Sequence, residues 1–81
     1  MARKHVGSPS AAVLHLPTAS FISKIKTFVS VIYEVATEQG ITAQWEHWGH
    51  GKYIVEAWDV TADQWSEIIA EASYRHLILT T

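Results

Sequence analysis

Residues 41–59 read ITAQWEHWGHGKYIVEAWD, and this stretch decides the fold. Apolar and polar residues alternate with a period of two on both sides of Gly49-His50-Gly51, which is typical of two strands joined by a tight turn. A three-residue loop pairs Trp48 with Lys52. That register gives one face the side chains of Ala43, Trp45, Tyr53, Val55 and Ala57. A two-residue loop scatters the apolar residues over both faces, so we expect the three-residue loop, with Gly51 in the left-handed bulge position.

A long helix is predicted before the hairpin, from about Thr18 or Ser20 to Gln39. Its apolar residues recur at steps of three and four, the period of an α-helix. They are Ile22, Ile25, Val29, Ile32 and Ala36. Gly40 follows at the position where a left-handed helix cap is common, so the helix is expected to end there.

A second helix is predicted after the hairpin. Thr61 is the N-cap and Gln64 the third helical residue, which together make a capping box. Val60 before the cap and Trp65 at the fourth helical position make the matching hydrophobic staple. Trp65, Ile68, Ile69 and Ala72 form the stripe that we expect to be buried.

Short apolar runs at both ends of the chain predict two more strands, at Ala11–Leu16 before Pro17 and at His76–Thr80. The predicted order is βαββαβ. We therefore expect an α+β, ferredoxin-like sandwich whose four-stranded antiparallel sheet carries both helices on one face. Residues 1–10 are predicted to be a flexible basic tail, and residues 11–81 a single ferredoxin-like domain.

Composition excludes several classes of function. The chain has 81 residues, with 6 Lys and Arg against 8 Asp and Glu, so a net charge of −2 does not favour duplex DNA or an anionic membrane as partner. No cysteine is present, which excludes disulfides and thiolate metal sites. The sequence shows neither a secretory signal nor an apolar run of the ~20 residues that span a bilayer, so a cytoplasmic location is expected.

The sheet face turned away from the helices is the predicted protein-binding surface. In the predicted register it exposes two tryptophans beside aliphatic and histidine side chains, a composition that commonly marks a contact surface. The predicted contact residues on this face and at the hairpin tip are Trp48, Ile54, Trp58, His15, Glu46, His50 and His76. We expect a non-enzymatic adaptor or inhibitor, of the kind that phages and other mobile elements encode. Its partner would be another protein or a second copy of itself.

Two alternatives remain open. His15, Glu56 and His76 could meet between the facing sheets of a homodimer that binds a small ligand or catalyses a reaction, because a carboxylate beside an imidazole is a general-base arrangement. Single-stranded nucleic acid could stack on Trp58, although Glu56 in the middle of that face would repel phosphate. No cofactor or metal is predicted: Glu46, His47 and His50 supply only part of a metal site.

Overall fold

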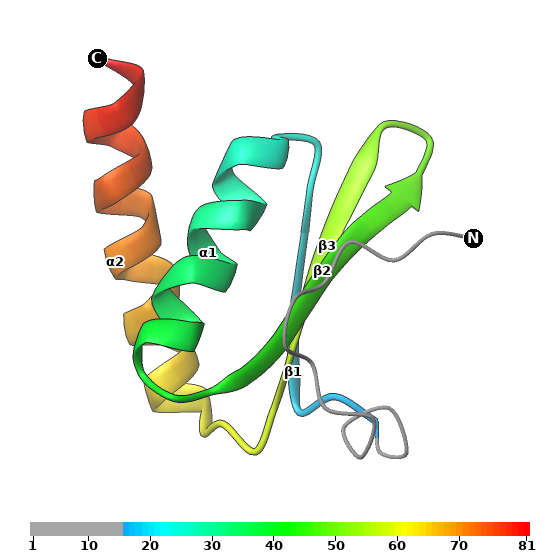
Figure 1. Cartoon of the computed structure of the whole chain (residues 1–81), viewed down its shortest axis with the longest axis vertical. Coiled ribbons are helices and arrows are strands. Elements are labelled where there is room, and N and C mark those ends of the chain that lie inside the picture. The colour runs from blue at the N-terminus through cyan, green and yellow to red at the C-terminus, as the bar shows by residue number, and fades with distance from the viewer. Residues whose placement is uncertain (1–15) are drawn as a thin grey trace.

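Residues 16–81, the part of the chain that this computed structural model describes, form three strands and two helices (Figure 1). In chain order they are β1 (Ala19–Ser23), α1 (Lys26–Glu38), β2 (Thr42–Gly49), β3 (Lys52–Trp58) and α2 (Ala62–Thr80). The sheet is antiparallel, with the strand order β1-β3-β2. The α+β class is therefore as predicted. The four-stranded ferredoxin-like sheet is wrong, because the described residues form three strands.

The start of the chain differs from the prediction at β1. Residues 19–23, which were expected in the first helix, form a strand that pairs with β3 and sets Phe21 opposite Val55. Ala19 and Phe21 pack against the core while Ile22 is exposed, so this segment has a period of two. Ile22 and Ile25 fit a helical stripe equally well, and pairing with β3 decides between the two periods. The predicted strand at residues 11–16 lies outside the described residues except for Leu16, which belongs to no strand.

The central hairpin confirms the predicted pairing but not the predicted loop. Ala43 lies opposite Ala57, Trp45 opposite Val55 and His47 opposite Tyr53, as expected. Gly49, however, pairs with Lys52, so the turn is two residues long. Its residues His50 and Gly51 have φ of 53° and 74°, the positive values that a type I′ turn requires. The extra residue sits in β2 as a bulge at Trp48, between His47 and Gly49. One extra residue shifts β2 relative to β3 by the same amount whether it lies in a bulge or in the turn. The pairing of Ala43, Trp45 and His47 could therefore be predicted although the turn was not.

The end of α1 is the predicted glycine cap. Gly40 has φ of +77°, and its N–H donates to the Thr37 carbonyl at 3.0 Å. The Ile41 N–H donates to the Ala36 carbonyl at 3.0 Å. These two bonds form a Schellman motif, which satisfies carbonyls that the helix end would otherwise leave unpaired.

The second helix begins as predicted and continues past its predicted end. The Thr61 hydroxyl accepts a hydrogen bond from the Gln64 N–H at 3.1 Å, and α2 then runs without interruption to Thr80. The predicted last strand at His76–Thr80 is therefore wrong. Neither glycine nor proline separates it from the preceding helix. The Thr80 hydroxyl also donates to the His76 carbonyl at 3.0 Å, which supports the helical conformation.

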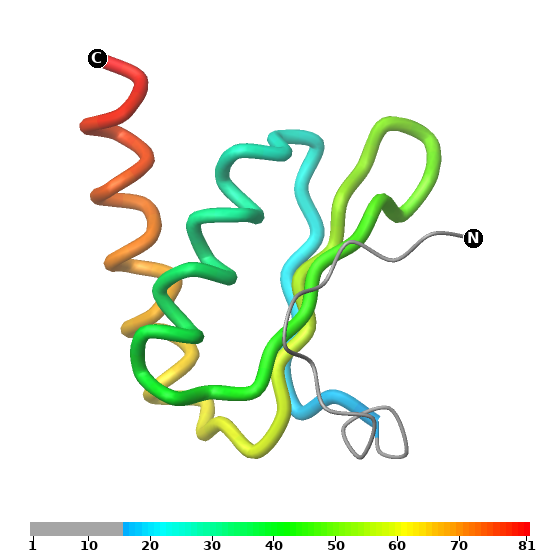
Figure 2. Tube along the Cα trace, in the orientation of Figure 1, coloured from blue at the N-terminus to red at the C-terminus, as the bar shows by residue number. Residues whose placement is uncertain are grey.

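The helices form two successive layers over one face of the sheet. Helix α1 contacts all three strands, whereas α2 packs mainly on α1 and reaches the sheet little (Figure 2). The prediction that both helices cover the sheet is wrong in this respect. The core lies where α1 meets the sheet on one side and α2 on the other. Its fully buried side chains include Val29, Ile32, Val35, Val55, Ile68 and Ala72.

Candidate functional site

The sheet face turned away from α1 is buried at the positions predicted to bind a partner. Glu46, Ile54 and Trp58 alternate with the core residues of β2 and β3, so they lie on this face as predicted. Their exposed fractions are only 5%, 4% and 6%. Neighbouring Gln44 is also buried, and its Nε2 donates to Oε1 of Glu56 at 3.1 Å. All four side chains are therefore buried in this structure, and the role of Glu46, Ile54 and Trp58 in binding a partner stays a prediction.

The hairpin tip keeps two predicted contact residues exposed. Trp48 occupies the bulge of β2 and is 53% exposed. His50 is exposed in the two-residue turn. This small surface stands at the far end of the sheet's long hairpin (Figure 1).

The remaining predicted histidines do not join these residues. His15 lies outside residues 16–81. His76 lies on α2, where its Nε2 is 3.1 Å from the hydroxyl oxygen of Thr27 and its ring centroid is 5.4 Å from that of Phe28. Glu56 alternates with core residues of β3 and faces away from the helices. His76 and Glu56 are therefore on opposite sides of the sheet, because the segment that carries His76 is helix and not strand.

The hairpin histidines do not assemble a metal site either. His47 packs beside Tyr53, with the ring centroids 5.2 Å apart. Within residues 16–81, no three His, Asp or Glu side chains converge closely enough to hold a metal ion.

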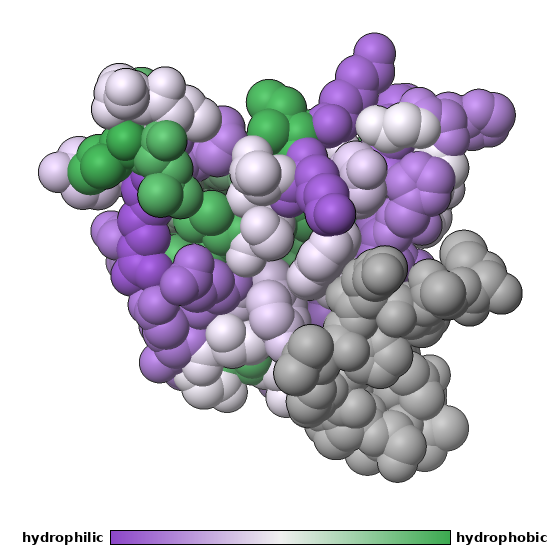
Figure 3. Space-filling model, turned by 45° about the horizontal axis from the view of Figure 1, so that its top comes forward, coloured by the Kyte–Doolittle hydropathy of each residue, from purple (hydrophilic) through white to green (hydrophobic). Residues whose placement is uncertain are grey.

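Within residues 16–81, four of the eight exposed large hydrophobic side chains lie near the end of α2. Four large side chains in the last two turns of this helix point into solvent. They are Tyr74 (62% exposed), Leu77 (61%), Ile78 (55%) and Leu79 (70%), and we call this group the α2 terminal patch. Figure 3 shows hydrophobic side chains gathered where α2 ends, next to hydrophilic side chains along the rest of the helix. The sequence prediction missed the patch because it assigned Leu77, Ile78 and Leu79 to a strand with one buried face.

A shallow groove runs along each side of the patch. One is lined by Ile25, Phe28, Ser73, His76, Leu77 and Thr80, and the other by Val31, Glu34, Arg75, Ile78 and Leu79. Each encloses about 280 Å³. This volume is just below the ~300–1,000 Å³ of typical small-molecule pockets, so the grooves suit the side chains of a partner better than a whole ligand.

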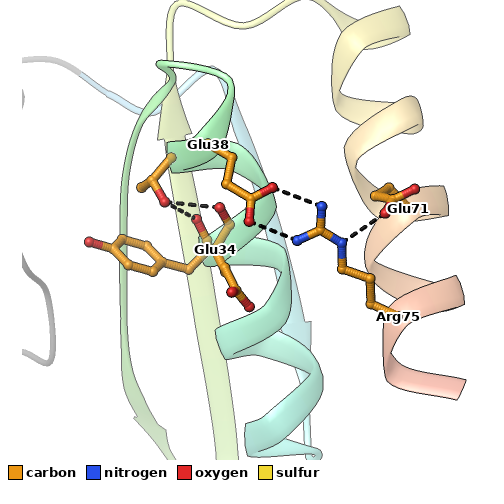
Figure 4. A network of polar contacts seen from close by, with 6 residues as sticks. Glu34, Glu38, Glu71 and Arg75 are labelled. Atoms are coloured by element: carbon orange, nitrogen blue, oxygen red, sulfur yellow. Dashed lines mark hydrogen bonds and ion pairs between the residues drawn. The ribbon is translucent and has the colours of Figure 1, made fainter. Parts of the chain in front are cut away.

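An ion-pair network fixes α2 against α1 beside the patch (Figure 4). The Arg75 guanidinium donates two hydrogen bonds of 2.8 Å to Glu38 on α1 and one of 2.7 Å to Glu71 on its own helix. The hydrogen bonds from Arg75 lower the pKa of the Glu38 carboxyl. The same contacts raise the pKa of Arg75, so both groups stay charged at neutral pH. This fork fixes the rotation of α2 and thereby the direction in which the patch points.

Comparison with known proteins identifies no relative: no known protein family, no curated protein and no solved structure matches the chain. Neither helix in residues 16–81 combines the length and the apolar character that crossing a membrane requires.

Proposed function

We propose that this chain is a non-enzymatic protein-binding module, an adaptor or an inhibitor, and that the α2 terminal patch is its main contact surface. A single observation carries the proposal: Tyr74, Leu77, Ile78 and Leu79 are all more than half exposed within two turns of one helix. Contiguous exposed apolar groups on a small domain usually mark an interaction site. Trp48 and His50 at the hairpin tip supply a smaller second surface.

The shape of the patch favours a protein over a small ligand. Its apolar side chains stand out from the helix, and the grooves beside it are open and shallow. Ligand sites are concave and surround most of their ligand. Helical residues at steps of three and four, such as Tyr74, Leu77 and Ile78, are the usual anchors when one helix docks on another protein.

A charge introduced into the patch tests the proposal. In cells that express the tagged full chain, we expect cross-linking to join residues 74–79 to a bound protein. Leu77→Glu should abolish those cross-links, because burying an unpaired carboxylate in an apolar contact is strongly unfavourable. Ala62→Glu adds the same charge at an exposed position at the start of α2 and should leave the cross-links intact.

Equal recovery of cross-linked protein by the two variants would refute the patch as the contact surface. Loss with Trp48→Ala alone would move the proposed contact to the hairpin tip. A cytoplasmic location and the absence of enzymatic activity remain predictions from the sequence.

A further inference from the structure

One of the two grooves beside the patch is apolar at one end and acidic at the other. Val31 of α1 and Ile78 and Leu79 of α2 line its apolar end. Glu34 and Arg75 line its other end, and we call this feature the α1–α2 groove. Both helices contribute side chains to it, so its shape depends on the packing that the Arg75 fork fixes (Figure 4).

Acidic side chains continue the α1–α2 groove away from the patch. Four exposed carboxylates stand on this side of the two helices. They are Glu34 and Glu38 on α1 and Glu67 and Glu71 on α2. At about 100° per residue, positions 67, 71 and 78 of α2 fall within about 40° of one another, so both α2 carboxylates share a side with Ile78. Four carboxylates and the one guanidinium of Arg75 give this row a net charge of −3.

The three lysines of residues 16–81 lie outside this row. Lys24 precedes α1, and Lys26, its first residue, has its Nζ 5.9 Å from the ring centroid of Trp45 on the sheet. Lys52 begins β3, next to the hairpin turn. The α1–α2 groove therefore offers a partner negative charge beside an apolar surface.

We infer that the α1–α2 groove binds a segment of another protein that carries lysine or arginine at one end and aliphatic residues at the other. This inference rests on the proposed protein-binding function and names the chemistry of the partner. Aliphatic side chains of the partner would cover Ile78 and Leu79, which removes apolar surface of both proteins from water. Its basic side chains would lie beside Glu34 and Glu67, two carboxylates outside the Arg75 fork.

The charge of the groove argues against other classes of partner. Nucleic acids and anionic lipids carry phosphates, which a surface of this charge repels. An acidic protein segment would need Arg75 as its counter-charge. The Nε and both terminal nitrogens of Arg75 already donate to Glu38 and Glu71. A basic segment is thus the complementary one.

The test is the binding of two labelled peptides to the purified full chain, followed by fluorescence anisotropy. The first peptide has about 12 residues, with lysines in one half and leucines and alanines in the other, because a helix of that length spans the ~18 Å from position 67 to position 79. The second peptide has glutamate in place of every lysine. We expect the lysine peptide to bind and the glutamate peptide not to bind. Binding should weaken as salt rises from about 0.05 to 0.5 M, since salt screens exposed charges.

Single variants locate the contact. Glu34→Gln and Glu67→Gln should each weaken binding of the lysine peptide about two- to fivefold, as expected for exposed ion pairs. Ile78→Ala should weaken it about tenfold, because less apolar surface is buried. Asp59→Asn removes the same charge at an exposed position outside the groove and should bind like the wild type. The φ of Asp59 is 58°, a conformation that asparagine also adopts, so this control should remain folded.

Three results would overturn the inference. They are a lysine peptide that does not bind at up to about 1 mM, a glutamate peptide that binds as well, and binding that both Glu34→Gln and Ile78→Ala leave unchanged. The protein-binding function can fail separately. If the lysine peptide does not bind but Leu77→Glu abolishes the cross-links in cells, the function stands and a basic partner is excluded; if those cross-links also persist, both proposals fail.

Discussion

Two aliphatic side chains of α2 are expected to contribute very differently to stability. Ile68 is fully buried between the helices, whereas Leu77 is 61% exposed in the α2 terminal patch. Ile68→Val removes one methylene from a closely packed site, so it should lower the free energy of unfolding by about 0.5–1.5 kcal/mol. Leu77→Ala removes more atoms but from a solvated position, so we expect a loss below about 0.5 kcal/mol.

This pair of variants tests the path of the chain after Arg75. If residues 76–80 formed an edge strand of the sheet, Leu77 would face the core. Truncation of a buried leucine to alanine costs about 2–5 kcal/mol. The order of the two effects would then be reversed. The comparison depends on burial alone, because both substitutions keep an apolar residue that a helix tolerates.

Urea unfolding followed by tryptophan fluorescence measures both effects, at a concentration where light scattering gives the 9.1 kDa monomer mass. With a slope near 1 kcal/mol per molar urea, Ile68→Val should lower the midpoint by about 0.5–1.5 M. Leu77→Ala should lower it by less than about 0.5 M, and so should Leu79→Ala, a second exposed position of the patch. A loss above about 2 kcal/mol for Leu77→Ala in the monomer would refute the packing of α2 described above.

Three further predictions concern the helix ends and the ion pair. Thr61→Ala removes the acceptor for the Gln64 N–H and should cost about 1 kcal/mol in urea unfolding, with Thr61→Ser restoring most of the loss. Gly40→Ala forces a Cβ into a left-handed backbone conformation and should cost about 1–2 kcal/mol by the same measurement; a smaller cost for Gly40→Asn would support that reason. Because Arg75 lowers the pKa of Glu38 in the folded state, the stability that this carboxylate adds is present above its ordinary pKa of 4.5 and is lost as the pH falls through the lowered value. Thermal unfolding from neutral to acid pH should therefore show the advantage of the wild type over Glu38→Gln disappearing in acid, and an advantage independent of pH would contradict the ion pair.

Local signals predicted the middle of this chain well. The pairing of Trp45 with Val55 follows from alternation, because a slip of one residue would turn every apolar side chain to the wrong face. The glycine cap at Gly40 and the hydroxyl cap at Thr61 depend only on backbone groups a few residues away. Such interactions can be read from sequence because both partners are neighbours in the chain.

The candidate surface was predicted less well, because its exposure depends on elements that are distant in the chain. His50 was expected to be exposed because it lies at a turn and Trp48 because it lies on the open sheet face, and both are exposed. Ile54 and Trp58 were placed on the correct face of their strand, but their burial depends on what lies over that face. His76 was assigned to the sheet because the short apolar run Leu77-Ile78-Leu79 beside it fits a strand and a helical turn equally well.

The sequence by itself determined the pairing of the two hairpin strands, the cap at Gly40 after α1, the cap at Thr61 before α2 and the absence of cysteine chemistry, because each of these follows from residue type and short spacing. Only the tertiary structure decided that Phe21 lies in a strand, that α2 continues to Thr80 and that α2 packs on α1. Segments of ambiguous period take the conformation that pairs their backbone and buries their side chains against distant elements. Here β3 makes residues 19–23 a strand, and the contacts of α1 with Arg75 and His76 hold the end of α2 as a helix.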